Sequence, residues 1–446
     1  MHDPLTPFAH LLPVSAAVVA GRLQIGGCDL EALADAYGTP LYLYDAATLD
    51  EAVTVYADAL RAHYPGPWEI AYASKAFLCT AIAQWAARRG LGLDVVSGGE
   101  LAIAQRAGFP PARMHFHGNN KREAELAQAL DCGLGRIVLD NEQEIARVER
   151  LAGAREETAT VWMRLTPNID VHTHAYQTTG LVDTKFGFPL TEGIAEAAAR
   201  RILRSPHLRL VGLHTHLGSQ VFDAEPIAQA VEVMLDFAAR LREDGFILRE
   251  LSPGGGWGVP YRPETSPAPI VPYIAALSAA VRAGCQRHGF EWPRLVIEPG
   301  RTLVARAGVA LYRVGGVKRM PGRTYVCIDG GMADNPRPAL YQAAYTALLV
   351  NRIGERATEM VAIAGPYCES GDILIQQTPL PPAQAGDLLA VPVAGAYHLS
   401  MASNYNAALR PAVLWVADGR AQVIQERETI DDLLRRDRPL PLTSER

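Results

Sequence analysis

The sequence predicts an α/β fold: a (β/α)8 TIM barrel with a second, mostly β domain of sandwich or barrel type. Two observations predict it. From about residue 66 to residue 298, short apolar β-prone runs alternate with helix-like segments, and after Arg301 short β-prone runs recur between Gly, Pro and Asp turns. Such alternation implies a parallel sheet with crossover helices, and eight repeats over about 250 residues match a TIM barrel. A doubly wound sheet competes with this interpretation, but the glycine fingerprint usual near its start is missing.

Eight runs are expected to form the barrel strands: 68–74, 91–96, 113–117, 136–140, 159–165, 208–216, 247–252 and 294–298. The segments between them are rich in residues that favour helix, and they are 80–89, 100–107, 123–131, 142–152, 193–203, 227–242 and 273–288. In the second domain the expected strands are 310–317, 324–328, 359–363, 388–393, 412–416 and 421–425, with 22–25 as an added N-terminal strand. We therefore expect a barrel domain over 43–301 and a β domain built from 1–42 and 302–446.

Composition excludes several classes of protein. The chain has 446 residues, 49% of them hydrophobic and 20% charged, a balance typical of a globular protein with two domains. Because the net charge is −6 and the basic residues are scattered, we expect no nucleic-acid partner. The longest early apolar stretch, 11–20, is too short to span a membrane and lacks the flanks of a secretory signal. Six dispersed cysteines without a CxxC pair predict reduced thiols in the cytoplasm.

Chemically active side chains gather at the ends of the expected strands. Read in order, these ends carry Lys75, Asp94, His117, Asp140, Arg164, His216, the Gly254-Gly255-Gly256 loop and Glu298. TIM-barrel enzymes place their active sites at the carboxyl ends of the strands. A barrel with a purely structural role would not need so many such groups there, so we expect an active site at this end.

Lys75 ends the first barrel strand, and a helix-like stretch follows it. A lysine that its neighbours shield from water becomes nucleophilic enough to form a Schiff base with an aldehyde. Most lysines at strand ends are solvated caps instead. The shielded kind is expected here if the rest of the chain supplies a partner for the amine.

The glycine loop after the seventh strand offers bare backbone N–H groups to a phosphate. Loops after strands seven and eight are a recurrent phosphate site in TIM barrels. Ser219, three residues past His216, could add a hydroxyl to the same anion. The alternative for an isolated run of three glycines is a tight turn.

Glu298 and His216 supply the remaining parts of a pyridoxal phosphate site. Glu298 could pair with a protonated ring nitrogen, or it could form a salt bridge to Arg301. His216 could stack on a flat ring, or it could be a hydrogen-bonded core histidine. Together with the amine of Lys75 and the phosphate loop, their order along the chain predicts a site for pyridoxal 5′-phosphate.

Longer motifs run along the chain in a fixed order. They are Tyr72-Ala73-Ser74-Lys75, Asp94-Val95-Val96-Ser97-Gly98-Gly99-Glu100, His117-Gly118-Asn119-Asn120-Lys121, Thr179-Gly180 with Lys185-Phe186-Gly187, His214-Thr215-His216-Leu217-Gly218-Ser219-Gln220, Gly254-Gly255-Gly256, Glu298-Pro299-Gly300-Arg301, Arg337-Pro338-Ala339-Leu340-Tyr341, Cys368-Glu369-Ser370, Gly395-Ala396-Tyr397 and Ser403-Asn404-Tyr405-Asn406. In this order they resemble the diaminopimelate decarboxylase family, from about residue 18 to residue 430.

The resemblance implies a fold-type III enzyme that works as a homodimer with active sites shared across the interface. The cofactor-binding residues it implies are Lys75, Asp94, Arg164, His216, Ser219, Gly254, Gly255, Gly256, Glu298, Gly300, Arg301 and Tyr397. The implied substrate-binding residues are Arg301, Arg337, Tyr341, Glu369 and Tyr397, and the implied catalytic residues are Lys75, Cys368, Glu298 and His216.

The same resemblance implies a role for each catalytic group. Lys75 would carry the Schiff base, His216 would stack on the cofactor ring and Glu298 would hold the pyridinium nitrogen. Cys368, contributed across the dimer with Glu369, would donate the proton after loss of carbon dioxide. Glu369 would bind the second amino group of the substrate. The distal carboxylate would be bound by Arg301, Arg337 and Tyr341.

Glu298 favours decarboxylation, because a carboxylate keeps the ring nitrogen protonated and the cofactor a strong electron sink. The related alanine racemases place an arginine there instead. Ornithine and arginine decarboxylases carry an acid after the Leu340-Tyr341 pair, where this chain has Gln342. A substrate with a second carboxylate is therefore expected: meso-2,6-diaminopimelate, converted to L-lysine and carbon dioxide in the last step of lysine biosynthesis.

Three positions depart from the residues frequent in the family: Phe77 stands where many relatives have asparagine, Trp257 where a smaller apolar residue is common, and Tyr345 where histidine is frequent. We expect none of these three departures to affect a residue with a chemical role. They leave open a specialised relative that acts on another carboxylated amino acid, or on an amino acid attached to a carrier in a biosynthetic cluster.

Two other classes of function remain as alternatives. His-x-His occurs at His115/His117, His172/His174 and His214/His216, and such a pair on one face of a strand suits a metal ion. Barrel hydrolases of that type carry the pair on the first strand, which here ends in lysine, so we expect no metal. A non-catalytic decarboxylase-like binding protein would lack the lysine or the cysteine, whereas Lys75 and Cys368 are both present.

Overall fold

The structure, a computed structural model, describes residues 3–169, 185–267 and 269–440. The chain folds into two compact units. The barrel unit comprises Ala47–Ala307 and Gly395–Ser400, and the β unit comprises Met1–Ala46, Gly308–Ala394 and Met401–Arg446.

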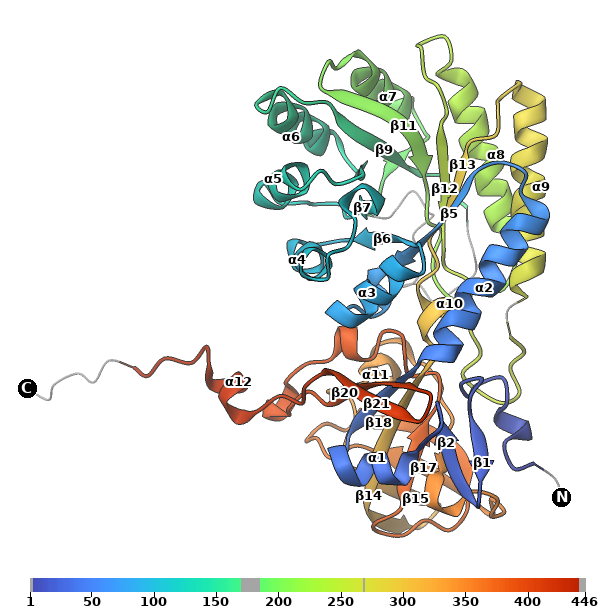
Figure 1. Ribbon diagram of the computed structural model, residues 1–446, viewed down its shortest axis with the longest axis vertical. Helices are drawn as coiled ribbons and strands as arrows, with labels where there is room; N and C mark the ends of the chain where they lie inside the picture. The colour runs from blue at the N-terminus through green and yellow to red at the C-terminus, as the bar shows by residue number, and fades with distance from the viewer. Residues whose placement is uncertain (1–2, 170–184, 268, 441–446) are drawn as a thin grey trace, which may run out of the picture. The chain divides into compact units, whose positions relative to one another are not determined.

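A closed parallel barrel forms the centre of the barrel unit (Figure 1). Its strands, in pairing order, are β5 (Trp68–Ala73), β6 (Gly92–Val95), β7 (Met114–Phe116), β8 (Arg136–Leu139), β9 (Ala159–Thr166), β11 (Leu208–His214), β12 (Glu250–Gly254) and β13 (Arg294–Ile297). The parallel pairings of β13 with β5 and of β8 with β9 close the ring. A short β10 (Phe188–Pro189) pairs beside β9. The predicted TIM barrel is confirmed.

Helices precede, connect and follow the strands of the barrel. They are α2 (Ala46–His63), α3 (Thr80–Arg88), α4 (Gly98–Arg106), α5 (Glu123–Asp131), α6 (Glu142–Gly153), α7 (Ile194–Arg204), α8 (Glu225–Arg240), α9 (Ile270–His288) and the short α10 (Arg301–Val304). Side-chain caps fix where some of them begin: Ser97 accepts a hydrogen bond from the N–H of Glu100, and Asn141 from that of Glu144. These caps stand directly after β6 and β8, so the strand ends are held in place by the helix starts.

The barrel interior combines apolar packing with buried polar groups. A cluster of almost fully buried side chains comprises Ala71, Val138, Trp162, Val211 and Val296. Beside it, Arg136 donates two hydrogen bonds of 2.6 Å to Glu250, which also accepts one of 2.6 Å from the indole of Trp162. Since branched apolar side chains usually fill TIM barrels, the polar part of this interior calls for a functional reason.

Lys121 and Glu144 form a buried ion pair that joins the loop after β7 to α6. The Lys121 ammonium is 2.9 Å from Oε2 of Glu144 and also donates to the carbonyl oxygens of Gly118 and Val138, at 2.8 and 2.7 Å. Glu144 accepts in addition from the N–H of Asp140, at 3.0 Å. The pair therefore positions the end of β8.

Lys121→Met is expected to destabilise the protein by about 3–5 kcal/mol, because it leaves the Glu144 carboxylate buried without a partner. Lys121→Met combined with Glu144→Leu should recover most of that loss. Urea titration measures the change, with Arg262→Met as the control for the exposed Arg262–Glu264 pair, which is expected to lose under about 1 kcal/mol. Equal losses in Lys121→Met and Arg262→Met would contradict the structural role of the buried pair.

The β unit is built on one large sheet. Its order is β18 (Ile373–Leu380), β17 (Glu359–Ala364), β15 (Arg323–Ile328), β14 (Gly308–Met320), β4 (Leu41–Asp45), β20 (Ala412–Ala417) and β21 (Arg420–Gln425), with β19 (Leu388–Val391) beside β14 and β16 (Leu348–Leu349) beside β19. A separate sheet holds β1 (Ala17–Val19), β2 (Arg22–Ile25) and β3 (Cys28–Asp29). Short helices are α1 (Leu30–Tyr37), α11 (Arg337–Tyr341) and α12 (Ile430–Leu434).

The N-terminal segment contributes to the β unit differently from the prediction. The expected strand at 22–25 forms as β2, but it pairs only with β1 and β3 among the described residues. The strand that enters the large sheet is β4, which pairs with β14 and β20. All five β4 residues are buried, which fits a central strand better than the half-buried β2 does.

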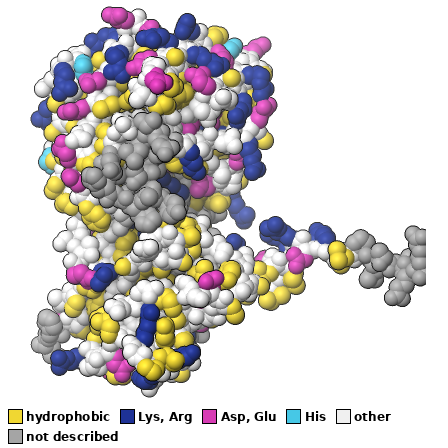
Figure 2. All heavy atoms as spheres, turned by 180° about the vertical axis from the view of Figure 1, so that it is seen from behind, with side chains coloured by type: hydrophobic (Ala, Val, Ile, Leu, Met, Phe, Trp, Pro, Cys, Tyr) yellow, Lys and Arg dark blue, Asp and Glu magenta, His cyan; other side chains and the backbone are white. Residues whose placement is uncertain are grey.

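Charge and hydropathy on the surface agree with the composition. On the face shown in Figure 2, Lys and Arg side chains are interspersed with Asp and Glu rather than gathered by sign. Among the helices of the described residues, none combines the length and the apolar character that crossing a bilayer requires.

Candidate active site

Lys75 lies directly after β5, in the short 3-10 turn Ser74–Ala76. Ser74 and Ala76 are buried, whereas Lys75 is exposed. The expectation that its neighbours shield this lysine is therefore wrong: the turn buries the residues on either side and leaves Lys75 open to solvent. Its charge still reaches the strand ends, because burial and then the Lys75 ammonium hold the pKa of His216 well below its usual range.

The Gly254–Gly256 loop can be built only from glycine. Gly254 and Gly256 have φ of +77° and +104°, a backbone conformation that other residues disfavour. A Cβ on Gly255 would lie 2.0 Å from the carbonyl oxygen of Glu298, and one on Gly256 would lie 2.1 Å from that of Gly218. The loop is thus a run of backbone with no room for side chains.

His216 follows β11 by two residues and is partly buried. The N–H of Gly255 donates to its Nδ1 at 3.3 Å, so the neutral ring carries its proton on Nε2. Because its pKa is low, the imidazole is uncharged at neutral pH. A neutral ring with a fixed orientation is suited to stacking on a flat aromatic group.

Glu298 is a buried carboxyl group at the end of β13. Its Oε1 accepts a hydrogen bond of 2.6 Å from the hydroxyl of Ser252, and its Oε2 lies 3.0 Å from Nε2 of His214. Burial and then the charge of Asp94 raise the pKa of Glu298 to about 7. A nearby protonated nitrogen would hold such a group as a carboxylate.

Arg301 begins α10 and is 6% exposed. It donates to the hydroxyls of Tyr261 and Ser219, at 2.6 and 2.9 Å, and its guanidinium lies 4.5 Å from the ring centre of Tyr397. Among the described residues its Nε has no hydrogen-bond partner. A buried cation whose hydrogen-bond partners are neutral hydroxyls favours the binding of an anion nearby. Arg301 makes these contacts in place of the salt bridge to Glu298 that the sequence left as an alternative.

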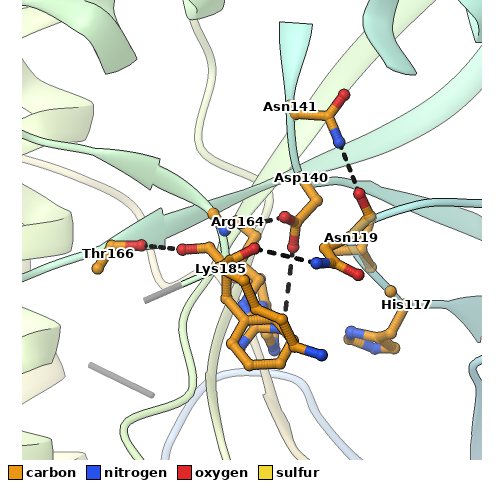
Figure 3. A network of polar contacts seen from close by, with 12 residues as sticks. His117, Asn119, Asp140, Asn141, Arg164, Thr166 and Lys185 are labelled. Atoms are coloured by element: carbon orange, nitrogen blue, oxygen red, sulfur yellow. Dashed lines mark hydrogen bonds and ion pairs between the residues drawn. The ribbon is translucent and has the colours of Figure 1, made fainter. Parts of the chain in front are cut away.

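Figure 3 shows the polar contacts at the ends of β8 and β9. Oδ1 of Asp140 accepts from the N–H of Gly187 at 3.0 Å, and its Oδ2 lies 4.0 Å from Arg164. Asn119 donates to the carbonyl oxygen of Lys185 at 3.2 Å. Arg164 is buried, which lowers the pKa of its guanidinium. Asp140 and Asn119 therefore hold Gly187 and Lys185 near the end of β8.

Asp94 lies within β6 and faces two imidazoles. Nδ1 of His115 is 3.1 Å and Nε2 of His117 is 3.5 Å from its Oδ1. Burial acts to raise the pKa of Asp94, but the two imidazoles hold it well below its usual range. These ligand-type atoms lie within 4.8 Å of one another, a spacing that a metal ion would also require. The pair at 172 and 174 falls outside the described residues.

Four expected site residues belong to the β unit: Arg337, Tyr341, Cys368 and Glu369. Cys368 and Glu369 are exposed, and the N–H of Cys368 donates to Asn406 at 3.1 Å. Arg337 is 2% exposed at the start of α11.

Tyr345 contacts one of the expected substrate-binding residues, Arg337. Its hydroxyl accepts a hydrogen bond from Arg337, whose guanidinium lies 5.7 Å from the ring centre. The contact arises because α11 ends at Gln342 in a left-handed conformation, φ 53°, which turns the chain so that Tyr345 is buried beside Arg337.

Four residues outside the predicted set of site residues also help to build the site. Ser252 and Tyr261 hold Glu298 and Arg301, and Glu100 accepts from the N–H of Val96 at 2.6 Å, where burial raises its pKa and Lys75 opposes the shift. His115 and Glu100 stand in patterns that the sequence shows, the His115/His117 pair and the motif from Asp94 to Glu100. Ser252 and Tyr261 have no local signal, because Glu298 and Arg301 are distant from them in the sequence.

The described residues fit pyridoxal phosphate. The glycine loop leaves room for no side chain, and Arg301 and Ser219 supply polar groups for an anion. His214 Nδ1 and Arg301 Nε are buried without hydrogen-bond partners among the residues described. Lys75 offers an accessible amine for the aldehyde of the cofactor, and Glu298 offers a buried carboxyl group for its ring nitrogen.

Comparison with known proteins agrees with this chemistry. Residues 49–305 match the family model "Pyridoxal-dependent decarboxylase, pyridoxal binding domain". The chain is 47% identical over 426 residues to the diaminopimelate decarboxylase of Bacillus subtilis (strain 168), covering 94% of this chain and 96% of the relative. It is 42% identical over 442 residues to that of Synechocystis sp., covering 97% and 94%. A solved diaminopimelate decarboxylase from M. jannaschii, in complex with L-lysine, matches with a TM-score of 0.88 at 34% identity, covering 96% and 98%. The chain belongs to the diaminopimelate decarboxylase family of pyridoxal-dependent decarboxylases.

Proposed function

We propose that this chain decarboxylates meso-2,6-diaminopimelate to L-lysine and carbon dioxide, with pyridoxal phosphate, in the last step of lysine biosynthesis. The observation that carries the proposal is the convergence of an accessible lysine, a glycine loop and a buried carboxyl group at the strand ends of one barrel. Similarity over nearly the whole chain to diaminopimelate decarboxylases, one of them solved with L-lysine, supports the same reaction.

Pyridoxal phosphate, when bound, supplies an electron sink for the pair left on the α-carbon as carbon dioxide departs. Lys75 would hold the cofactor covalently, and Glu298 would hold the proton of the ring nitrogen. His216, uncharged, would fix the plane of the ring from one face. The remaining proposed cofactor contacts are Asp94, Arg164, Ser219, Gly254, Gly255, Gly256, Gly300, Arg301 and Tyr397.

The β unit would complete the site of a second subunit. We propose a homodimer in which Cys368 of the partner subunit donates a proton to the α-carbon, and Glu369 of the partner subunit binds the distal amino group. The exposure of both residues supports this, because a group that serves another subunit must be accessible. Arg337, Tyr341, Arg301 and Tyr397 are proposed for the distal carboxylate. A cytoplasmic location belongs to the same proposal, supported by six free cysteines.

Carbon dioxide release by the purified protein tests the substrate. Diaminopimelate, ornithine, arginine and lysine are assayed in parallel, and release from diaminopimelate alone is expected, since Gln342 offers no acid to a distal ammonium. Release from ornithine or arginine would contradict that argument. Release from none of the four would favour another carboxylated or carrier-bound amino acid, to which the unusual Tyr345 beside Arg337 would then be relevant.

Glu369→Ala is expected to raise KM for diaminopimelate by about tenfold or more, because one ionic hydrogen bond to the distal amino group is lost. Cofactor affinity should stay the same. Steady-state kinetics and cofactor titration measure the two effects, and Glu426→Ala, an exposed glutamate of the same unit, is the control. Equal weakening of substrate and cofactor binding would mean that Glu369 has only a structural role.

A further inference from the structure

Carboxyl and imidazole groups alternate in a line through the barrel interior, called here the carboxyl–imidazole line. Its outer half joins Oε1 of Glu69 to Nε2 of His115 at 3.5 Å, and Nδ1 of His115 to Oδ1 of Asp94 at 3.1 Å. Its inner half runs from that oxygen to Nε2 of His117 at 3.5 Å, from there to Oε1 of Glu298 at 3.8 Å, and from Oε2 of Glu298 to His214 at 3.0 Å.

Strand register explains why the line forms. Asp94 pairs with His115 across β6 and β7, and paired residues of neighbouring strands turn to the same face of a sheet. His115 and His117 are two residues apart, so they share that face. Glu69 stands near the start of β5 and Glu298 follows the end of β13. The line therefore runs from the amino ends of the strands to the carboxyl ends.

The outer end of the line reaches a cavity. Glu69 lines a cavity of about 440 Å³ with other residues at or near the amino ends of strands, among them Trp68, Leu91, Arg113 and Arg294. Its side chain is 16% exposed, against 3% for His115. Arg294 lies 3.4 Å from its other carboxyl oxygen.

The pKa values of the two buried carboxyl groups of the line, Asp94 and Glu298, are shifted in opposite directions. The pKa of His115 is lowered by burial, but the hydrogen bond and charge of Asp94 outweigh this and raise it. The pKa of Asp94 is held low, while that of Glu298 is raised to about 7. Such a separation is typical of sites in which one carboxyl group stays ionised and the other exchanges a proton.

We propose that His115 is a positioning residue for the decarboxylation. It lies between Glu69 and Asp94 and holds the Asp94 carboxylate against His117. In this way it determines how readily Glu298 gives up its proton. This inference rests on the proposed function, because the ring nitrogen of the cofactor is the group that Glu298 serves. His115 acts through Asp94, and Glu69 acts through His115.

The charged groups around Glu298 determine the direction of the effect. Asp94 opposes its ionisation, whereas His117 and His115 favour it, and His214 and Arg164 also face it. Loss of His115 leaves the charge of Asp94 less compensated, so the pKa of Glu298 should rise.

His115 itself is faced by acids from three strands besides β6. Glu69 on β5, Glu298 after β13 and Glu250 on β12 all lie close enough to affect it or be affected by it. Glu250 is already held by two hydrogen bonds from Arg136 on β8. That leaves Asp94 as the group that depends most on His115, since Glu69 also has Arg294 at 3.4 Å.

Proton release on cofactor binding tests the inference. Cofactor-free protein is titrated with pyridoxal phosphate by calorimetry, in two buffers of different ionisation enthalpy, across the pH range. When the cofactor binds with its ring nitrogen already protonated, a Glu298 carboxyl group that still carries a proton releases it to the buffer. Release therefore falls as pH rises past about 7 in the wild-type protein. His115→Phe is expected to move this transition upward by about one pH unit, and Glu69→Gln by less in the same direction.

Two further variants separate positioning from packing. His115→Gln keeps a hydrogen bond to Asp94 without the charge and should give an intermediate shift. His288→Phe removes another imidazole–carboxylate pair, 2.7 Å from Asp236, outside the barrel interior, and should give none. In the assembled enzyme, His115→Phe should lower kcat about tenfold at neutral pH and leave KM for diaminopimelate unchanged.

An unshifted transition in both His115→Phe and Glu69→Gln overturns the inference. If His115→Phe does not fold, Glu69→Gln, which conserves shape at a partly exposed position, decides alone. Failure of the wild-type protein to bind pyridoxal phosphate overturns the proposed function instead, so the two failures are distinguishable.

Discussion

Replacing Lys75 with alanine is expected to lower kcat/KM by at least about a thousandfold and to abolish covalent retention of the cofactor. The reason is chemical: an amine is needed to form a Schiff base with the cofactor aldehyde, and alanine has none. Borohydride reduction followed by mass spectrometry of the peptides measures the covalent link directly.

The modified residue can be assigned unambiguously because the chain has only four lysines: Lys75, Lys121, Lys185 and Lys318. Lys121 is enclosed with Glu144, and Lys318 belongs to the β unit. Lys185 is the matched control, since its carbonyl oxygen is held by Asn119 near the same strand ends. A reduced adduct on Lys185 in the wild-type protein, or one that survives Lys75→Ala, would refute the assignment.

The barrel could be predicted because its pattern is local. Each strand is a short apolar run and each helix a longer segment of helix-forming residues, so their alternation is visible without knowing which strands pair. The helix α2 was missed because it precedes the first barrel strand and follows β4, a strand of the β unit. The strand β18 was missed for another reason: only four of its eight residues are buried, and Gln376, Gln377 and Pro379 interrupt its apolar character.

Candidate site residues could likewise be predicted from the strand ends, but their contacts could not. The bond between Ser252 and Glu298 and the pairing of Asp94 with His115 depend on register between neighbouring strands. Register is set by how whole strands pack, and nothing within a single strand specifies it. The exposure of Lys75 was mispredicted for a similar reason, because a 3-10 turn changes which residues are buried.

Tyr345 illustrates the limit of reading one position at a time. Its departure from the family pattern has no meaning until the left-handed turn at Gln342 places it against Arg337. A tyrosine hydroxyl is neutral at physiological pH, whereas a histidine can carry a charge. The substitution therefore removes a possible second cation from the surroundings of Arg337.

Glu298→Gln is expected to lower kcat by roughly a hundredfold or more, because an amide cannot hold the ring nitrogen protonated as a carboxylate does. The same change should stabilise the cofactor-free protein at alkaline pH. Burial raises the pKa of Glu298 to about 7, above the value of about 4.3 for an unfolded chain. The native protein then binds the extra proton. Glu298 therefore contributes its full stabilisation below the pKa of the unfolded chain, and this contribution is lost as pH rises through the pKa of the native protein.

Glu250→Gln is the matched control, since Glu250 and Glu298 are equally buried at 7% exposure in the same barrel. Burial acts to raise the pKa of Glu250 as well, but its hydrogen bonds and ion pair with Arg136 outweigh this and lower it. Its contribution to stability is therefore present above the unfolded pKa and lost in acid, the opposite sign from Glu298.

Urea titrations of the two cofactor-free variants between pH 4 and pH 8 measure the contrast. At pH 8, Glu298→Gln should be more stable than wild type by on the order of 2–3 kcal/mol, and the gain should disappear towards pH 4. Glu250→Gln should be less stable than wild type at pH 8 and approach it in acid. If the stability difference from wild type changed with pH in the same direction for both variants, Glu298 would not have the raised pKa that the proposed role requires. A group that is already stable as a carboxylate would gain little from a cationic ring.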